Sequence, residues 1–198
     1  MRFYGVHPWD VLSPDAAAGI DSLPARLAAE PSAGVGEAGL DRLRSRTVSD
    51  AQRILFARQL AIAAEYRRPV VLHGAKCWGE TLKRCVQHKG AIPAFLFHGF
   101  SRSEGLLPQI FALNGFVSVG PAAANVHAVN YRRMVAELPP DMILVESDMD
   151  DDADPAARRE TLASIYSALA ELRGTSAAGL AETVRRNALR FASFRSAS

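Results

Sequence analysis

The stretch "PVVLHGAK", residues 69–76, runs from three apolar strand formers straight into His73 and Gly74. A second stretch, "AFLFHGF" at residues 94–100, has the same order and ends its apolar run at His98. Continuous apolar runs, rather than alternating ones, are typical of parallel strands that are buried on both faces. Because such folds place functional groups at the carboxyl ends of their strands, we expect the two histidines to converge on one site.

Four more apolar runs extend this pattern over the chain. The complete set of predicted strands covers residues 2–6, 33–39, 68–74, 93–99, 115–120 and 142–148. Predicted helices lie at residues 50–67, 79–90, 101–115, 129–140, 154–174 and 176–194. Alternating strands and helices predict an α/β fold with a parallel sheet and right-handed crossovers.

The spacing of the polar strand ends favours a barrel. About 25 residues separate His73 from His98, and about 50 separate His98 from Asp148, with one predicted strand between them. A βα unit of a (β/α) barrel takes roughly 25–30 residues, so these positions fall in phase. Glu37 lies near the end of an earlier predicted strand. The sequence therefore predicts a TIM-barrel-like arrangement with four polar side chains at one mouth.

Two imidazoles and two carboxylates at strand ends make a set of metal donors. Neutral imidazole suits Zn, Mn, Fe or Ni, and carboxylates suit these ions and Mg. Two histidines and one carboxylate leave positions open for water and substrate, and a bound ion brings the pKa of water from about 16 toward about 7. This set favours hydrolysis over redox chemistry. For each histidine taken alone we favour a hydrogen-bonded structural role, and it is the pair in phase with Glu37 and Asp148 that favours a site.

Further residues near the predicted strand ends are candidates for substrate contact. His7 follows the first strand, and Lys76 follows the strand that carries His73; the alternative for Lys76 is a solvated lysine. Trp9 and Trp78 suit either base stacking or ordinary packing. An exposed basic loop that could steer an anionic substrate holds Arg42, Arg44 and Arg46.

Length and composition indicate an ordinary globular protein. The 198 residues fit one domain, 1–198, and are 48% hydrophobic and 22% charged with a net charge of +2. This balance demands neither nucleic acid nor an anionic membrane as partner. The sequence has no apolar run of the roughly 18 residues that span a membrane, and its start lacks the apolar core of a signal peptide. Two cysteines without a disulfide framework fit the cytoplasm, which we expect as the location.

Six segments, in order over nearly the whole chain, resemble the TatD family of metal-dependent hydrolases and deoxyribonucleases. They are "GVHPWD" (5–10), "GVGEAGLD" (34–41), "QRILFARQLAIAAEYRRPVVLHGA" (52–75), "FHGFS" (97–101), "ILVESD" (143–148) and "NALRFASF" (187–194). The resemblance implies a (β/α)₈ barrel and hydrolysis of phosphodiesters, typically in DNA. It also implies metal ligands at Glu37, His73, His98 and Asp148, with the glutamate bridging where two ions are bound.

The chain departs from the family pattern in several places. It has no His-x-His sequence, which in the family supplies ligands from the first strand, and Met1 stands where the third strand would begin. We therefore expect about six parallel βα units in an incomplete or distorted barrel. We also expect one divalent ion (Zn, Mn or Mg) rather than two. Ala75 and Lys76 replace a family arginine, and Met149 replaces a proline.

Our main hypothesis is a metal-dependent hydrolase acting on DNA or a small phosphoester. Glu37, His73 and His98 would hold the ion, and Asp148 would be a further ligand or the general base. One alternative is a degenerate relative that binds a partner or its own copy without turnover. Another is hydrolysis of a cyclic amide or ester. Open sheet edges would make a homo-oligomer one remedy for unpaired strands.

Overall fold

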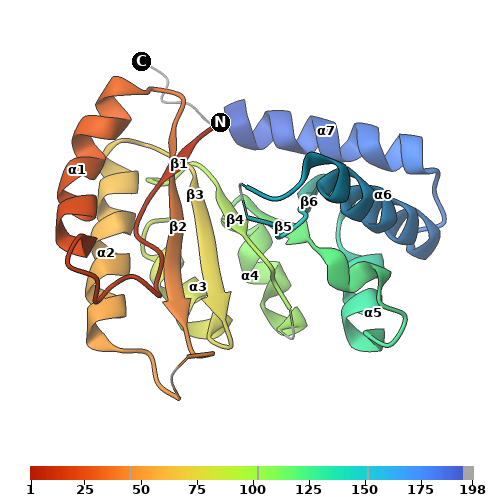
Figure 1. Ribbon diagram of the computed structural model, residues 1–198, viewed down its shortest axis with the longest axis horizontal. Coiled ribbons are helices and arrows are strands. Elements are labelled where there is room, and N and C mark those ends of the chain that lie inside the picture. Colours follow the sequence, from red (N-terminus) through yellow and green to blue (C-terminus); the bar gives the residue numbers. More distant parts are fainter. Residues whose placement is uncertain (45, 102, 151, 194–198) are drawn as a thin grey trace.

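The computed structural model describes residues 1–44, 46–101, 103–150 and 152–193. One parallel sheet runs through it in chain order (Figure 1). Its strands are β1 (Phe3–Tyr4), β2 (Gly34–Asp41), β3 (Val70–Ala75), β4 (Phe95–Phe97), β5 (Gly115–Val119) and β6 (Ile143–Val145). Within the described residues no pairing joins β1 to β6, so the sheet does not close. The prediction of an incomplete barrel with six parallel strands is confirmed.

Helices follow the strands and cover the outside of the sheet (Figure 1). They are α1 (Ala16–Ala29), α2 (Asp50–Glu65), α3 (Trp78–Val86), α4 (Leu107–Phe111), α5 (Val129–Glu137), α6 (Pro155–Leu172) and α7 (Ala177–Ser193). Short 3₁₀ turns lie at Glu104–Leu106 (η1), Pro121–Ala124 (η2) and Pro140–Met142 (η3). Across the described chain, no helix is both long enough and apolar enough to cross a membrane.

Some elements differ from the sequence predictions. The helix α1 was not predicted, because Gly19 and Pro24 interrupt its pattern, yet it buries an apolar stripe that includes Ile20. The helix predicted at 101–115 is only η1 and α4, which has Pro108 in its first turn. The helices predicted at 101–115 and 176–194 also contain Arg102 and Phe194, which lie outside the described residues.

Alternation along the strands places His73 and His98 on the face opposite to two fully buried apolar side chains. Leu72 and Phe97 are fully buried under the helices. Successive strand residues point to opposite faces, so His73 and His98, each one position further along the chain, point the other way. The histidines therefore stand on the inner face, at the carboxyl-terminal mouth of the sheet.

Glu37 reaches the same mouth from the middle of its strand, because β2 extends to Asp41. This corrects the prediction that Glu37 lies near a strand end. The pairing of β2 with β3 is irregular here: Val35 pairs with Val70, but Ala38 pairs with Leu72. The extra residue of this bulge re-aims the local side chains. It allows Glu37 to point toward the histidine of β3 although its neighbours are buried.

The helix α7 ties together the two open sides of the sheet. The ring of Phe191 stacks on Phe3 of β1 at 6.1 Å and meets Phe116 of β5 edge-on at 5.4 Å. The side-chain amide of Asn187 donates to the carbonyl oxygens of Pro140 and Ile143, next to β6. One helix thus contacts the first strand and the last two.

Candidate metal centre

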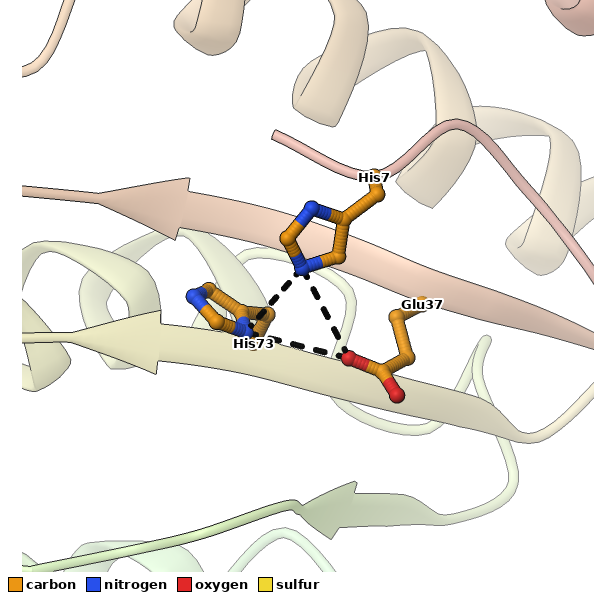
Figure 2. Close-up of side chains that lie close together, drawn as sticks. All are labelled: His7, Glu37 and His73. Atoms are coloured by element: carbon orange, nitrogen blue, oxygen red, sulfur yellow. Dashed lines mark hydrogen bonds and ion pairs between the residues drawn. The ribbon is translucent and has the colours of Figure 1, made fainter. Parts of the chain in front are cut away.

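His7, Glu37 and His73 point toward one another at the mouth of the sheet (Figure 2). Their facing donor atoms lie within 4.8 Å of one another. The closest approach is 3.3 Å, between His7 Nε2 and His73 Nδ1. Glu37 Oε2 is 3.7 Å from His73 Nδ1 and 3.8 Å from His7 Nε2. Ligands at about 2 Å from one ion lie roughly 3 Å apart, so only small shifts separate these atoms from coordination geometry.

Asp41 fixes which ring nitrogen His73 presents to this cluster. The carboxylate is 1% exposed, and its Oδ2 lies 2.7 Å from His73 Nε2. Its Oδ1 accepts the backbone N–H groups of Leu43 and Arg44. Burial works against the charged form, but these hydrogen bonds, with that to His73 foremost, outweigh it and lower the pKa of Asp41. The ionised carboxylate accepts a hydrogen bond from the Nε2–H group, which leaves the lone pair of His73 Nδ1 facing Glu37.

A carboxylate also orients His98, but here it contacts Nδ1 and leaves Nε2 facing the cluster, the reverse of His73. His98 Nδ1 lies 2.5 Å from Glu146 Oε2, while Glu146 Oε1 accepts the N–H of Gly99. The other nitrogen, Nε2, lies 3.3 Å from Asp148 Oδ1 and 4.0 Å from Glu37 Oε1.

The charge state of His98 follows from these neighbours. Burial lowers the pKa of His98, but the hydrogen bond with Glu146 and the surrounding carboxylates raise it to about 9. At neutral pH the ring is therefore protonated on both nitrogens, carries a positive charge and donates a hydrogen bond from each. Nε2 must give up its proton before it can bind a metal ion.

Glu37 stands between the two histidine groups. Its Oε2 faces His73 and His7, and its Oε1 is the oxygen nearer to His98. The nearby rings of His73, His98 and His7, with His73 foremost, lower the pKa of Glu37, against the opposing effect of burial. An ionised carboxylate with an oxygen toward each group can serve ligands on either side.

His7 presents a proton rather than a lone pair. Its Nδ1 accepts the backbone N–H of Trp9 at 3.2 Å, so in the neutral ring the proton sits on Nε2. Burial, followed by the repulsion from His73, lowers the pKa of His7 and keeps the ring neutral. The Nε2–H group therefore points at the lone pair of His73 and at Glu37. Within the three-residue cluster, His7 is suited to donating a hydrogen bond.

The remaining predicted residues line the cavity around this cluster. Asp148 follows β6, and its side chain is 65% exposed; it contacts His98 but lies outside the group of three donors. Lys76 is exposed just after β3. The cavity has a volume of about 940 Å³, and its lining includes His7, Glu37, His73, Lys76, His98 and Asp148.

A second cavity of about 970 Å³ adjoins the first one. It lies over the turn after β5 and the start of α5, where its lining includes Tyr131 and Arg133. Gly99, Ser101 and Asp148 line both cavities. Asp148 therefore lies where the two cavities meet, at the carboxyl-terminal mouth of the sheet.

Sequence reasoning missed the roles of Asp41 and Glu146. Both lie inside quoted motifs, "GVGEAGLD" and "ILVESD", each near a carboxylate that was chosen as a ligand. The available signal was the second acidic residue near each strand end. The spacing alone does not tell a ligand from a carboxylate that orients one.

Comparisons of the sequence with known proteins all point to the same family. A family model described as TatD related DNase matches residues 1–193. The 3'-5' ssDNA/RNA exonuclease TatD of Pectobacterium carotovorum is 30% identical over 197 residues, which cover 94% of this chain and 75% of that protein. The uncharacterized metal-dependent hydrolase YjjV of Escherichia coli is 28% identical over 192 residues, covering 92% of this chain and 73% of YjjV.

Solved structures agree with the sequence comparison. The crystal structure of the TatD homologue YjjV from Escherichia coli matches with a TM-score of 0.81 at 26% identity, over 96% of this chain and 75% of that one. A TatD family hydrolase from Entamoeba histolytica matches with a TM-score of 0.78 over 96% of this chain and 73% of that one. At 15% identity, this second likeness concerns the fold alone.

Proposed function

Because the chain belongs to the family of TatD related DNases, we propose that it is a metal-dependent phosphodiesterase that acts on single-stranded nucleic acid. The observation that carries this proposal is the pair of histidines, His73 and His98, each locked by its own carboxylate beside Glu37. Locked imidazoles are characteristic of metal ligands, because the second hydrogen bond fixes both tautomer and orientation. We take single-stranded nucleic acid as the substrate class because the similar Pectobacterium protein is named an ssDNA/RNA exonuclease.

We assign one divalent ion to Glu37, His73 and His98. Glu37 and His73 belong to the group of three donors with His7, whereas His98 lies outside that group, its Nε2 4.0 Å from Glu37 Oε1, and must move closer to share the ion. The lone pair of His73 already faces Glu37, and that of His98 becomes available once Nε2 is deprotonated. Two imidazoles and one carboxylate suit Zn²⁺ or Mn²⁺ better than Mg²⁺, which prefers oxygen ligands. Since His7 offers a proton and Asp148 is exposed, we expect one firmly bound ion rather than two.

The other residues supply the remaining roles. A bound ion would acidify a water molecule and polarise a phosphoryl oxygen. Asp148, at the junction of the two cavities, accepts a proton from the attacking water and orients it. The Nε2–H of His7 donates a hydrogen bond to a non-bridging phosphate oxygen, and the exposed ammonium of Lys76 attracts the phosphate.

Calorimetry on the protein stripped of metal tests this proposal. We expect about one Zn²⁺ or Mn²⁺ to bind per chain, and a His73→Ala, His98→Ala double variant to lose this binding. A labelled single-stranded oligonucleotide should be cleaved by the loaded protein and not by an Asp148→Asn variant. His88→Ala is the matched control, because His88 follows α3 and lies outside the residues that line either cavity.

Two results would contradict the proposal in different ways. Equal metal binding by the wild-type chain and the double variant would remove the metal centre. Binding of metal without cleavage of any phosphodiester, across Zn²⁺, Mn²⁺ and Mg²⁺, would support the degenerate relative that binds a partner without turnover.

A further inference from the structure

Trp9 is an exposed aromatic ring in the wall of the cavity that holds the metal donors. Its ring centroid lies 4.9 Å from that of His7 and 6.1 Å from that of His73. Trp9 is 44% exposed, whereas Trp78 is 5% exposed and packs against Phe97. The two tryptophans therefore have different roles, since only Trp78 is explained by core packing.

Several contacts hold the Trp9 ring in a fixed position. The guanidinium carbon of Arg44 lies 3.7 Å from the ring centroid, over one face. Trp9 is among the groups that lower the pKa of Asp41, and the backbone N–H of Trp9 donates to His7 Nδ1. Asp41 also accepts the backbone N–H of Arg44, so one buried carboxylate interacts with both halves of this stack. A ring that is ordered in advance loses little conformational entropy when a ligand stacks on it.

Cations flank one side of this ring, whereas the carboxylates of Asp10, Glu37, Asp148 and Asp150 line the rest of the cavity. Arg44 stands on the ring itself, and the loop that carries it also holds Arg42, whose Nε donates to the carbonyl of Arg46. Lys76 lines the same cavity. An aromatic ring with a guanidinium on one face, next to a cluster of metal donors, matches the alternation of flat bases and phosphates in a single strand.

We propose that Trp9, capped by Arg44, is the stacking platform for the base of the nucleotide whose phosphate reaches the metal donors. The proposal rests on the function proposed above and adds the residues that recognise an unpaired base. A base inside a duplex is stacked on both sides and offers no free face, so this platform selects single strands. Stacking on an indole is tolerant of base identity, and we expect little sequence preference.

Fluorescence titration in the presence of a chelator tests the platform without turnover. The probes are oligo(dT) and an abasic sugar–phosphate oligomer of the same length. Trp78 also lines this cavity but is 5% exposed, so the Trp9→Phe protein, which keeps Trp78 as its one tryptophan, gives the baseline against which quenching of Trp9 is measured. We expect oligo(dT) to quench the emission and to bind about tenfold more tightly than the abasic oligomer. In an anisotropy titration, Trp9→Ala should reduce oligo(dT) binding to the abasic level, while Trp9→Phe should keep most of it.

Ile54→Ala is the matched control, since Ile54 is an exposed apolar residue on α2 away from the cavity. Equal affinity of the wild-type chain for both probes would overturn the platform, and so would unchanged oligo(dT) binding by Trp9→Ala. Retained binding by Trp9→Phe shows that a loss in Trp9→Ala reflects the ring and not misfolding. Cleavage without any effect of Trp9 would overturn the platform alone, whereas base-dependent binding without metal uptake would overturn the catalytic proposal alone.

Discussion

At the scale of single residues, the two histidines present different nitrogens to the same glutamate. His73 offers Nδ1 because its Nε2 is engaged by Asp41, and His98 offers Nε2 because its Nδ1 is engaged by Glu146. These two carboxylates thus decide which atom of each ring can bind a metal. The orientation of both rings is set before any ion arrives, and His98 must still lose the proton on Nε2.

Asp41 gives the sharpest test of this principle. Asp41→Asn keeps an oxygen for the two backbone N–H groups but turns an NH₂ group toward His73. The His73 proton is then expected to move to Nδ1, where it blocks coordination. We predict that metal affinity falls by about 10- to 100-fold, measured by calorimetry, with little change in the circular dichroism spectrum.

The control for this variant is Asp50→Asn, at the exposed start of α2, which should leave metal affinity unchanged. Wild-type affinity in Asp41→Asn would show that the Asp41 contact is structural and does not select the ring nitrogen of His73.

The sequence was enough to predict which residue types form the site, but not which carboxylates are ligands and which orient the histidines. His73, His98 and Glu37 were recognised because they stand in phase at the ends of apolar runs or within a family motif. Asp41 and Glu146 are carboxylates in the same segments. Separating a ligand from an orienting group requires knowing which oxygen faces which nitrogen. That relation joins residues on different strands and leaves no mark in local spacing.

At the scale of elements, the pairing of β2 with β3 is what brings Glu37 and His73 together. Gly39 pairs directly with His73. A Cβ atom at Gly39 would lie 1.9 Å from the carbonyl oxygen of His73, and the glycine has a φ of +156°. The two backbones can approach this closely only because no side chain stands between them.

Gly39→Ala is therefore expected to push β2 away from β3. We predict a loss of roughly 1–3 kcal/mol in the free energy of unfolding, measured by urea denaturation, together with weaker metal binding. Gly79→Ala in α3 is the control: nothing lies within 4 Å of its added Cβ, and alanine favours the helix by about 1 kcal/mol. An unchanged unfolding midpoint in Gly39→Ala would mean that the strands can separate without cost.

The elements themselves were predictable to different degrees. The pair formed by α2 and β3 was predicted closely, because Ser49 caps the helix and the strand is a continuous apolar run. The position of Glu37 was not predicted, because a bulge depends on the register with the neighbouring strand. Local sequence carries caps and periodicity, whereas register is a property of two segments.

At the scale of the whole molecule, an incomplete barrel must stabilise its two open sides. The edge strands are short: β1 has two residues and β6 has three. Short edges limit the number of unpaired backbone groups, which reduces the tendency to pair with other chains. Self-association, expected from the sequence as one remedy, stays a prediction. The contacts of α7 are a second remedy, built into the chain.

Phe191 is the residue on which this remedy depends. Its ring stacks on Phe3 of the first strand and touches Phe116 of the fifth, and it is 5% exposed. Phe191→Ala would empty the space between the two sides of the sheet. We predict that the free energy of unfolding falls by about 3–5 kcal/mol, measured by urea denaturation.

Leu189→Ala on the same helix isolates this effect, because Leu189 is 57% exposed and its loss should change the free energy of unfolding by about 0.5 kcal/mol or less. If Phe191 joins the two sides, Phe3→Ala and Phe191→Ala will be non-additive in a double-mutant cycle, since each removes the same contact. Strictly additive losses, or a cost for Phe191→Ala no larger than that for Leu189→Ala, would mean that the open sides are held by something other than α7. Because the metal donors lie at the opposite, carboxyl-terminal mouth, any Phe191→Ala protein that remains folded should bind metal with wild-type affinity.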